Sequence, residues 1–261
     1  MDFGLNGKTA LIFGASGGLG AAMARALAAE GANVVLAARN EAALLALATE
    51  LAGLGVRTHA MAWDLADLAG HDARVAAAEA ALGPIDILVN NTGGPPPTPA
   101  AGQDPQVWLA QFNAMVLSVI RITDLVLPGM RARQWGRIIT SASSGVIAPI
   151  PNLGISNTLR ASLVAWSKTL SREVARDGVT ANVIVPGRVA TDRITFLDAQ
   201  RAKREGRSVE DIQRESAASI PAGRYGDPAE YGAAAAFLAS RQASYITGSV
   251  LRIDGGMIAN I

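Results

Sequence analysis

A short apolar run near the start of the chain passes directly into a glycine cluster: Thr9-Ala10-Leu11-Ile12-Phe13-Gly14-Ala15-Ser16-Gly17-Gly18-Leu19-Gly20. The apolar run has the length and composition of a buried strand, and residues 18–30 have the apolar spacing of a helix. Glycine permits the backbone conformations that a tight turn between these two elements needs. The stretch therefore predicts a strand, a turn and a helix, which together begin a βαβ unit.

The same alternation continues to the end of the chain. Short runs rich in β-branched residues alternate with longer Ala- and Leu-rich stretches of helical period, which is the pattern of a doubly wound parallel sheet. We expect strands at residues 9–14, 33–38, 57–63, 85–90, 137–141, 180–185 and 249–253. We expect helices near residues 18–30, 40–53, 72–82, 104–132, 153–177 and 227–240. The pattern predicts one Rossmann-type α/β domain over residues 1–261, a seven-stranded parallel sheet with helices on both faces.

The composition limits the partners that the chain can have. A formal charge of +1 gives no overall field that would attract nucleic acid or an anionic membrane, so we expect small-molecule partners. No uninterrupted apolar run approaches the roughly 20 residues that cross a bilayer. Asp2 is atypical of a secretory leader, so we expect a cytoplasmic protein. Cysteine is absent, and His59 and His71 are too few for a metal cluster, so we expect no metal site.

The glycine cluster also has the features of a phosphate-binding turn. Its glycines let backbone N–H groups approach a pyrophosphate, and the helix that follows offers unpaired N–H donors at its positive end. Glycine-rich turns are common, so it is the position directly after a strand that favours this interpretation. We expect a dinucleotide to bind here through Gly14, Ser16, Gly17, Gly18, Leu19 and Gly20.

Further candidate binding residues follow the next three predicted strands. Arg39 stands where an acidic residue would accept hydrogen bonds from a ribose 2′-hydroxyl; an arginine matches a 2′-phosphate instead, which favours NADP over NAD. The alternative is a surface arginine that opens the next helix. Asp64 and Leu65 end the third strand, and Asn90 and Gly93 mark the end of the fourth. Because parallel strands end at one edge of a sheet, we expect these residues beside the cofactor, although Asn90 could instead belong to a capped turn.

Taken together, these residues resemble the short-chain dehydrogenase/reductase family over nearly the whole chain. The glycine motif of that family matches Gly14, Gly18 and Gly20, and its Asn-Asn-Ala-Gly motif matches residues 90–93. The segments at residues 223–228, 246–248 and 254–256 are most similar to the bacterial 3-oxoacyl-acyl-carrier-protein reductase branch.

The resemblance implies roles for residues in the second half of the chain. It places a catalytic asparagine at Asn113 and a catalytic serine at Ser143. It also implies a turn that binds the nicotinamide end of the cofactor, formed by Pro186, Gly187, Val189 and Thr191.

The chain departs from the family at the pair of residues that delivers the proton. Where the family carries a tyrosine and, four residues later, a lysine, this chain carries Ser156 and Arg160. Their spacing still puts both side chains on one face of a helix. A serine hydroxyl is too weak an acid to be tuned near pH 7, and arginine does not release its proton. We expect both residues in catalytic positions, with Arg160 also at the cofactor and the usual proton donor absent.

The interpretation that we favour is an NADP(H)-dependent oxidoreductase with an atypical active site, acting on a small carbonyl, imine or alcohol. General acid help is worth roughly 10²- to 10⁴-fold, so its loss slows hydride transfer without abolishing it. The alternatives are a dinucleotide-binding protein without turnover, and a lyase or isomerase that uses the same pocket.

Two expectations concern the second half of the chain beyond the active site. Residues 188–222, which include the charged stretch at 201–215, are expected to form a mobile cover over the substrate; a solvated amphipathic helix is the alternative for the charges. The helix at residues 228–240 and the last strand resemble the segments through which members of the family form tetramers. We therefore expect a homotetramer.

Overall fold

Strand β1 (Thr9–Phe13) lies inside a parallel sheet, between β2 (Asn33–Ala38) and β4 (Ile87–Asn91). In the computed structural model, which describes residues 2–260, the seven strands follow the order β3-β2-β1-β4-β5-β6-β7. The remaining strands are β3 (Thr58–Ala62), β5 (Gly136–Ser141), β6 (Val179–Pro186) and β7 (Val250–Ile253). All pairs are parallel, which confirms the predicted Rossmann-type sheet.

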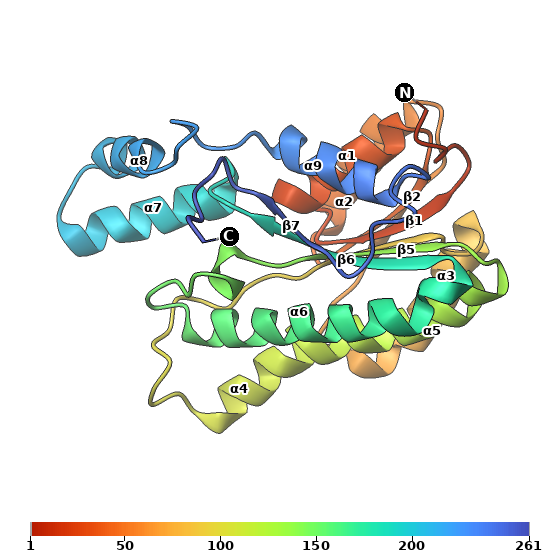
Figure 1. The fold of residues 1–261 in the computed structure, drawn as a ribbon, viewed down its shortest axis with the longest axis horizontal. Helices are drawn as coiled ribbons and strands as arrows, with labels where there is room; N and C mark the ends of the chain where they lie inside the picture. Colours follow the sequence, from red (N-terminus) through yellow and green to blue (C-terminus); the bar gives the residue numbers. More distant parts are fainter. Residues whose placement is uncertain (1, 261) are drawn as a thin grey trace.

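Helices connect the strands and cover both faces of the sheet (Figure 1). Their bounds are α1 (Gly18–Ala29), α2 (Glu41–Ala52), α3 (His71–Leu82), α4 (Pro105–Phe112), α5 (Ser118–Ala132), α6 (Gly154–Val174), α7 (Asp192–Glu205), α8 (Val209–Ala218) and α9 (Pro228–Ala239). Short 3-10 helices lie at Leu68–Gly70, Ser144–Val146 and Ala175–Asp177.

The alternation of side chains along β1 explains the two layers. Ala10 and Ile12 belong to a core that α1, α2 and α9 complete on one face of the sheet. Leu11 and Phe13 belong to a second core, which α3, α5 and the end of α6 complete on the other face. Because both faces are buried, the strand is apolar from Ala10 to Phe13, as the sequence pattern indicated.

The long helix expected at residues 104–132 is interrupted by a π-helical turn, η2 (Asn113–Leu117). In this turn the backbone N–H of Ser118 donates to the carbonyl of Asn113, five residues earlier. The turn spans only five residues inside a helix of 28, so the coarse helical period of the whole stretch did not reveal it. π-turns of this kind are frequent at functional sites, and Asn113 begins this one.

The helix formed by α4, η2 and α5 is, by length and composition alone, apolar enough to cross a membrane. Its side chains at Ile122, Val126 and Met130 instead contribute to the core on one face of the sheet. Core helices of proteins that stay in water pass the same test, so this helix is weak evidence for a membrane partner.

The charged stretch at residues 201–215 is divided between two helices instead of forming one. Gly206 ends α7 with a φ of 64°, in the left-handed region that favours glycine, and the hydroxyl of Ser208 caps α8 by accepting from the N–H of Asp211 at 3.1 Å. Helices α7 and α8 together form an arm that extends beyond the sheet (Figure 1).

His71 is a buried histidine that opens α3. Its Nδ1 accepts a hydrogen bond from the indole Nε1 of Trp63 at 3.1 Å, so the proton of the neutral ring lies on Nε2. Burial, with a smaller contribution from the nearby Arg74, lowers the pKa of His71 below its ordinary value. The unfolded chain therefore takes up a proton before the folded chain does as the pH falls below about 6.5.

We expect the free energy of unfolding to fall as the pH drops from about 6.5 through the pKa of folded His71. His71→Gln keeps an acceptor for the indole and does not titrate, so its urea unfolding midpoint should depend less steeply on pH between about 7.5 and 5.5. His59→Gln, at the half-exposed second histidine on β3, is the matched control. An undiminished slope in His71→Gln would contradict this assignment.

Candidate active site at the carboxyl edge of the sheet

The strand order reverses between β1 and β4, and in such sheets ligands bind in the crevice outside the carboxyl ends of these two strands. The glycine cluster lies at this point. Gly14 has a φ of 64°, and a Cβ there would lie 2.5 Å from Nδ2 of Asn91. A Cβ on Gly20 would lie 2.1 Å from the carbonyl oxygen of Gly14. Only glycine fits these two positions, because the loop folds tightly against β4 and the start of α1.

The first turn of α1 is open to a ligand. Its N-cap, Gly17, provides no side-chain hydrogen bond, and no acidic residue lies in the first turn. Gly17 and Gly18 are exposed, while Ser16 and Leu19 are half-buried. An uncapped helix N-terminus beside a glycine turn fits an anionic group such as a pyrophosphate.

The residues after β2 and β3 lie at the same edge of the sheet. Arg39 is exposed, and no ion pair involves it within residues 2–260. The next residue, Asn40, caps α2 through its side chain, so Arg39 is not needed for that cap. Asp64 is exposed and accepts from the N–H of Ala66 at 3.0 Å, and Leu65 packs partly against the core.

The two asparagines that end β4 have different surroundings. Asn91 donates from Nδ2 to the carbonyl of Phe13 at 3.2 Å and so ties β4 to β1. Asn90 is buried; its Nδ2 donates to Thr123 at 3.5 Å, and its Oδ1 has no partner within the described chain. The exposed Gly93 follows, and its carbonyl is used by a side chain from α6.

Arg160, on α6, is the side chain that contacts Gly93, and it connects the ends of β4 and β5. Its Nη2 donates to the carbonyls of Thr92 at 3.1 Å and Gly93 at 3.0 Å, and its Nη1 donates to the carbonyl of Ser141 at 3.3 Å. Arg160 is 8% exposed. Burial lowers its pKa to about 10, so the guanidinium remains charged at neutral pH.

The two serines predicted to be catalytic lie at the start of α6 and directly after β5. Ser156 lies one helical turn before Arg160 and is buried. Ser143 caps the 3-10 helix after β5, where its hydroxyl accepts from the N–H of Gly145 at 3.1 Å. A Cβ on Gly145 would lie 3.4 Å from Oγ of Ser143 and 2.2 Å from Oδ1 of Asn157, so these two polar atoms flank this glycine.

Asn157 is a residue that the sequence reasoning missed. Its Nδ2 donates to the carbonyl of Ile150 at 2.9 Å, while its Oδ1 is buried without a partner in the part of the chain that the structure describes. The only sequence signal was its place beside Ser156. Asn113, half-buried at the start of the π-turn, is the remaining predicted catalytic residue.

The three tyrosines of the chain do not lie as free acids at this site. Tyr231 is fully buried on α9, within 2.9 Å of the hydroxyl of Ser141, and donates to the carbonyl of Ile184 at 3.2 Å. Burial raises its pKa above the ordinary value. Tyr225 donates to the carboxylate of Asp198 at 2.8 Å, and Tyr245 is fully exposed.

The segment after β6 faces the glycine loop. Gly187 donates its N–H to Ile253 at 2.9 Å, and a Cβ there would lie 2.6 Å from Cα of Asp254. Val189 pairs with Gly226 in an isolated bridge. Thr191, at the N-cap of α7, would contact a Cβ on Gly18 at 3.7 Å. Pro186, at the end of β6, therefore leads into a stretch that runs beside the start of α1.

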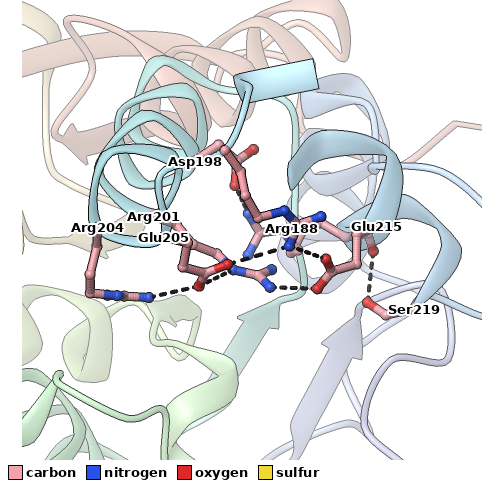
Figure 2. A network of polar contacts seen from close by, with 9 residues as sticks. Arg188, Asp198, Arg201, Arg204, Glu205, Glu215 and Ser219 are labelled. Carbon is pink, nitrogen blue, oxygen red and sulfur yellow. Dashed lines mark hydrogen bonds and ion pairs between the residues drawn. The ribbon is translucent and has the colours of Figure 1, made fainter. Parts of the chain in front are cut away.

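The arm is attached to this segment by a buried ion pair. Arg188 pairs with Asp198 of α7, which is fully buried and also accepts from Tyr225 (Figure 2). One helical turn further along α7, Arg201 pairs with Glu205 at 2.9 Å and with Glu215 of α8. A cavity of about 340 Å³ lies between the two helices and residues 223–225, and its lining includes Ala190, Ile194, Thr195, Gln213, Ala217 and Tyr225.

The sheet reversal, the glycine loop and the uncapped first helix define a Rossmann-type protein with a ligand crevice at the carboxyl edge of its sheet. Residues 14–258 match the family model described as enoyl-(acyl carrier protein) reductase. The chain belongs to the short-chain dehydrogenase/reductase family.

Known relatives cover almost the whole chain. The D-β-hydroxybutyrate dehydrogenase of Cupriavidus necator is 35% identical, over 98% of this chain and 99% of that protein. The 3-oxoacyl-acyl-carrier-protein reductase of Escherichia coli is 37% identical, over 96% of this chain and 97% of that protein. The crystal structure of L-sorbose reductase from Gluconobacter frateurii, complexed with NADPH and L-sorbose, has a TM-score of 0.94 and 35% identity, with full coverage of both chains. These relatives are oxidoreductases, as the sequence predicted for this chain.

Proposed function

We propose that this protein is an NADP(H)-dependent oxidoreductase that reduces or forms a small carbonyl compound without a tyrosine proton donor. The observation that carries the proposal is the buried, charged Arg160 at the ends of β4 and β5, directly beside an open dinucleotide crevice. NADPH, when bound, supplies the hydride. The relatives support this reaction class, and L-sorbose reductase, a neighbour in structure, was crystallised with NADPH.

Different parts of the crevice would hold different parts of the cofactor. The uncapped start of α1, with residues 14–20, would bind the pyrophosphate. Arg39 would pair with the 2′-phosphate, and Asp64, Leu65, Asn90 and Gly93 would line the adenosine side. The nicotinamide end would lie against Arg160 and the segment Pro186, Gly187, Val189 and Thr191. The unpartnered Oδ1 of Asn90 is a buried acceptor that a ligand group could satisfy.

We infer that Ser156 and Arg160 take the places of the family's tyrosine and lysine. The hydroxyls of Ser143 and Ser156 would donate hydrogen bonds to the carbonyl oxygen, and the charge of Arg160 would stabilise the oxyanion that forms on it. Neither the serine hydroxyls nor the guanidinium of Arg160 is an acid that titrates near pH 7, so water would deliver the proton. An iminium substrate is disfavoured, because a buried guanidinium repels a cation.

The most direct test is a titration of the protein with NADPH, followed by a screen of ketones, imines and alcohols for turnover. The proposal predicts saturable NADPH binding and slow reduction of carbonyl compounds. Binding without any turnover across the screen would favour a dinucleotide-binding protein instead.

The cofactor preference depends on Arg39. NADPH should bind more tightly than NADH, because the exposed Arg39 can pair with the 2′-phosphate, and hydrogen bonds to charged groups are worth about 1.5–3 kcal/mol. Arg39→Ala should remove most of the preference, roughly 10-fold or more, while NADH affinity changes little. Calorimetric titration of both cofactors measures this. Equal affinities in the unmodified protein would show that Arg39 is only a surface residue.

The arm formed by α7 and α8 is proposed as the mobile cover of the site. The buried Asp198 attaches α7 to the segment after β6, whereas the ion pairs that Arg201 and Arg207 make with Glu215 of α8 are exposed and worth about 0–1 kcal/mol each. We infer that α8 and the turn before it move while α7 stays attached through Asp198.

We also expect a homotetramer. Edge strand β7 exposes Val250 and Leu251, and α9 exposes Phe237. An exposed apolar edge strand is a surface that proteins usually cover. Multi-angle light scattering at micromolar concentration measures the assembly, and a monomer would contradict the expectation.

A further inference from the structure

Two guanidinium groups meet at the loop after β4. Arg193, in the first turn of α7, donates from Nη2 to the carbonyl of Pro95 at 3.2 Å. A Cβ on Gly94 would lie 3.6 Å from Nη2 of Arg160 and 3.7 Å from Nη2 of Arg193. The two charges therefore flank a single glycine at the mouth of the proposed active site, although 33 residues separate them in the sequence, from 160 to 193.

Neither guanidinium is paired with a carboxylate within the described residues; both donate only to backbone carbonyls. Other arginines near the site are paired: Arg188 with Asp198, Arg201 with Glu215, and Arg224 with Glu230 at 2.6 Å. Partial burial lowers the pKa of Arg193, although much of its side chain stays exposed to solvent. Two uncompensated positive charges close to each other repel, so an anion between them would be stabilising.

We propose that Arg193 binds a carboxylate of the substrate, so that the enzyme acts on a short oxo acid or hydroxy acid rather than on a neutral ketone. This inference rests on the proposed function. The fork of an arginine matches a carboxylate with two parallel hydrogen bonds. The 48% exposed ring of Phe196 lies 5.9 Å from the guanidinium of Arg193, and it offers an apolar surface for the carbon chain of such an acid.

The cofactor's pyrophosphate is the other anion in this crevice, and its expected place is different. It would lie at the start of α1, where Gly18 approaches Thr191. Gly94 instead follows β4 and adjoins Arg160. The charge at Gly94 is therefore available to the substrate while the cofactor is bound.

The experiment compares matched pairs of probes: calorimetry uses the protein loaded with NADP⁺, which cannot reduce a probe, and the turnover assays use NADPH. The 3-oxo acids of four to eight carbons are tested against their neutral methyl esters and their N-acetylcysteamine thioesters. Calorimetry gives the dissociation constant of each probe, and NADPH absorbance gives kcat/KM. The acid should be preferred over its ester by about 10- to 100-fold for at least one chain length, because a hydrogen-bonded charge is lost in the ester.

Arg193→Gln should abolish this preference while leaving NADPH affinity within about twofold. Lys203→Gln is the matched control: it removes the same charge from the exposed face of the same helix, about 15 Å further along its axis, and should keep the preference. The inference is overturned if no acid binds more tightly than its ester or thioester, or if Arg193→Gln keeps the preference. Equal turnover of esters and acids would overturn carboxylate binding by Arg193 and leave the oxidoreductase proposal intact. If no probe is turned over, the oxidoreductase proposal is overturned, and the dissociation constants still decide whether Arg193 binds a carboxylate.

Discussion

The double substitution Ser156→Tyr with Arg160→Lys is expected to raise kcat/KM for a neutral ketone such as cyclohexanone by about 10²-fold or more. A tyrosine at this position would supply an acid whose ordinary pKa is about 10, and the lysine charge one helical turn away would lower that pKa. The single changes should give much less. Ser156→Tyr would have only the guanidinium beside it, and Arg160→Lys would supply charge without a proton donor.

Steady-state oxidation of NADPH measures the gain, and its pH dependence provides a second readout. The double variant should lose activity as the pH rises through the pKa of the new tyrosine, whereas the unmodified protein should lack this step. Because Ser156 is buried, a tyrosine ring must displace neighbouring side chains, so cofactor affinity and thermal stability are measured alongside. Rapid ketone reduction by the unmodified protein would show that another group already delivers the proton.

Arg160→Met is expected to be the most damaging single substitution at the site. It removes the donor that the carbonyls of Thr92, Gly93 and Ser141 share, and leaving a buried acceptor unsatisfied costs about 1–3 kcal/mol. It also removes the positive charge proposed to stabilise the oxyanion, which is worth about 10²- to 10³-fold in kcat. We expect a lower unfolding midpoint, weaker NADPH binding and nearly complete loss of turnover.

Arg160→Lys separates the two effects, because an ammonium keeps the charge but makes fewer directed contacts. Arg160→Lys should lose about as much stability as Arg160→Met but retain part of the turnover of a carbonyl substrate. If Arg160→Met proved as active as the unmodified protein, Arg160 would be a structural residue that merely joins β4 to β5.

The candidate site was only partly visible in the sequence. Arg160 and Ser156 could be singled out because they interrupt a familiar pattern, yet their neighbours could not. Asn157 and Arg193 belong to no recognisable spacing, and their place beside Gly145 and Gly94 depends on how loops from different strands meet. The roles of all these residues remain predictions.

Local pattern was sufficient for the architecture. The apolar runs and the glycine cluster determined seven parallel strands, whose ends agree with the expected bounds to within two residues, because burial on both faces and a tight turn leave direct marks in neighbouring residues. Tertiary structure alone decided what surrounds each charge. Arg160 meets Thr92 across 68 residues of sequence and Arg193 meets Pro95 across 98. These contacts follow from the order in which the strands pair and from the path of the loops beyond them. The period of apolar residues in the sequence indicates only whether a side chain is buried, not which distant backbone group it will contact.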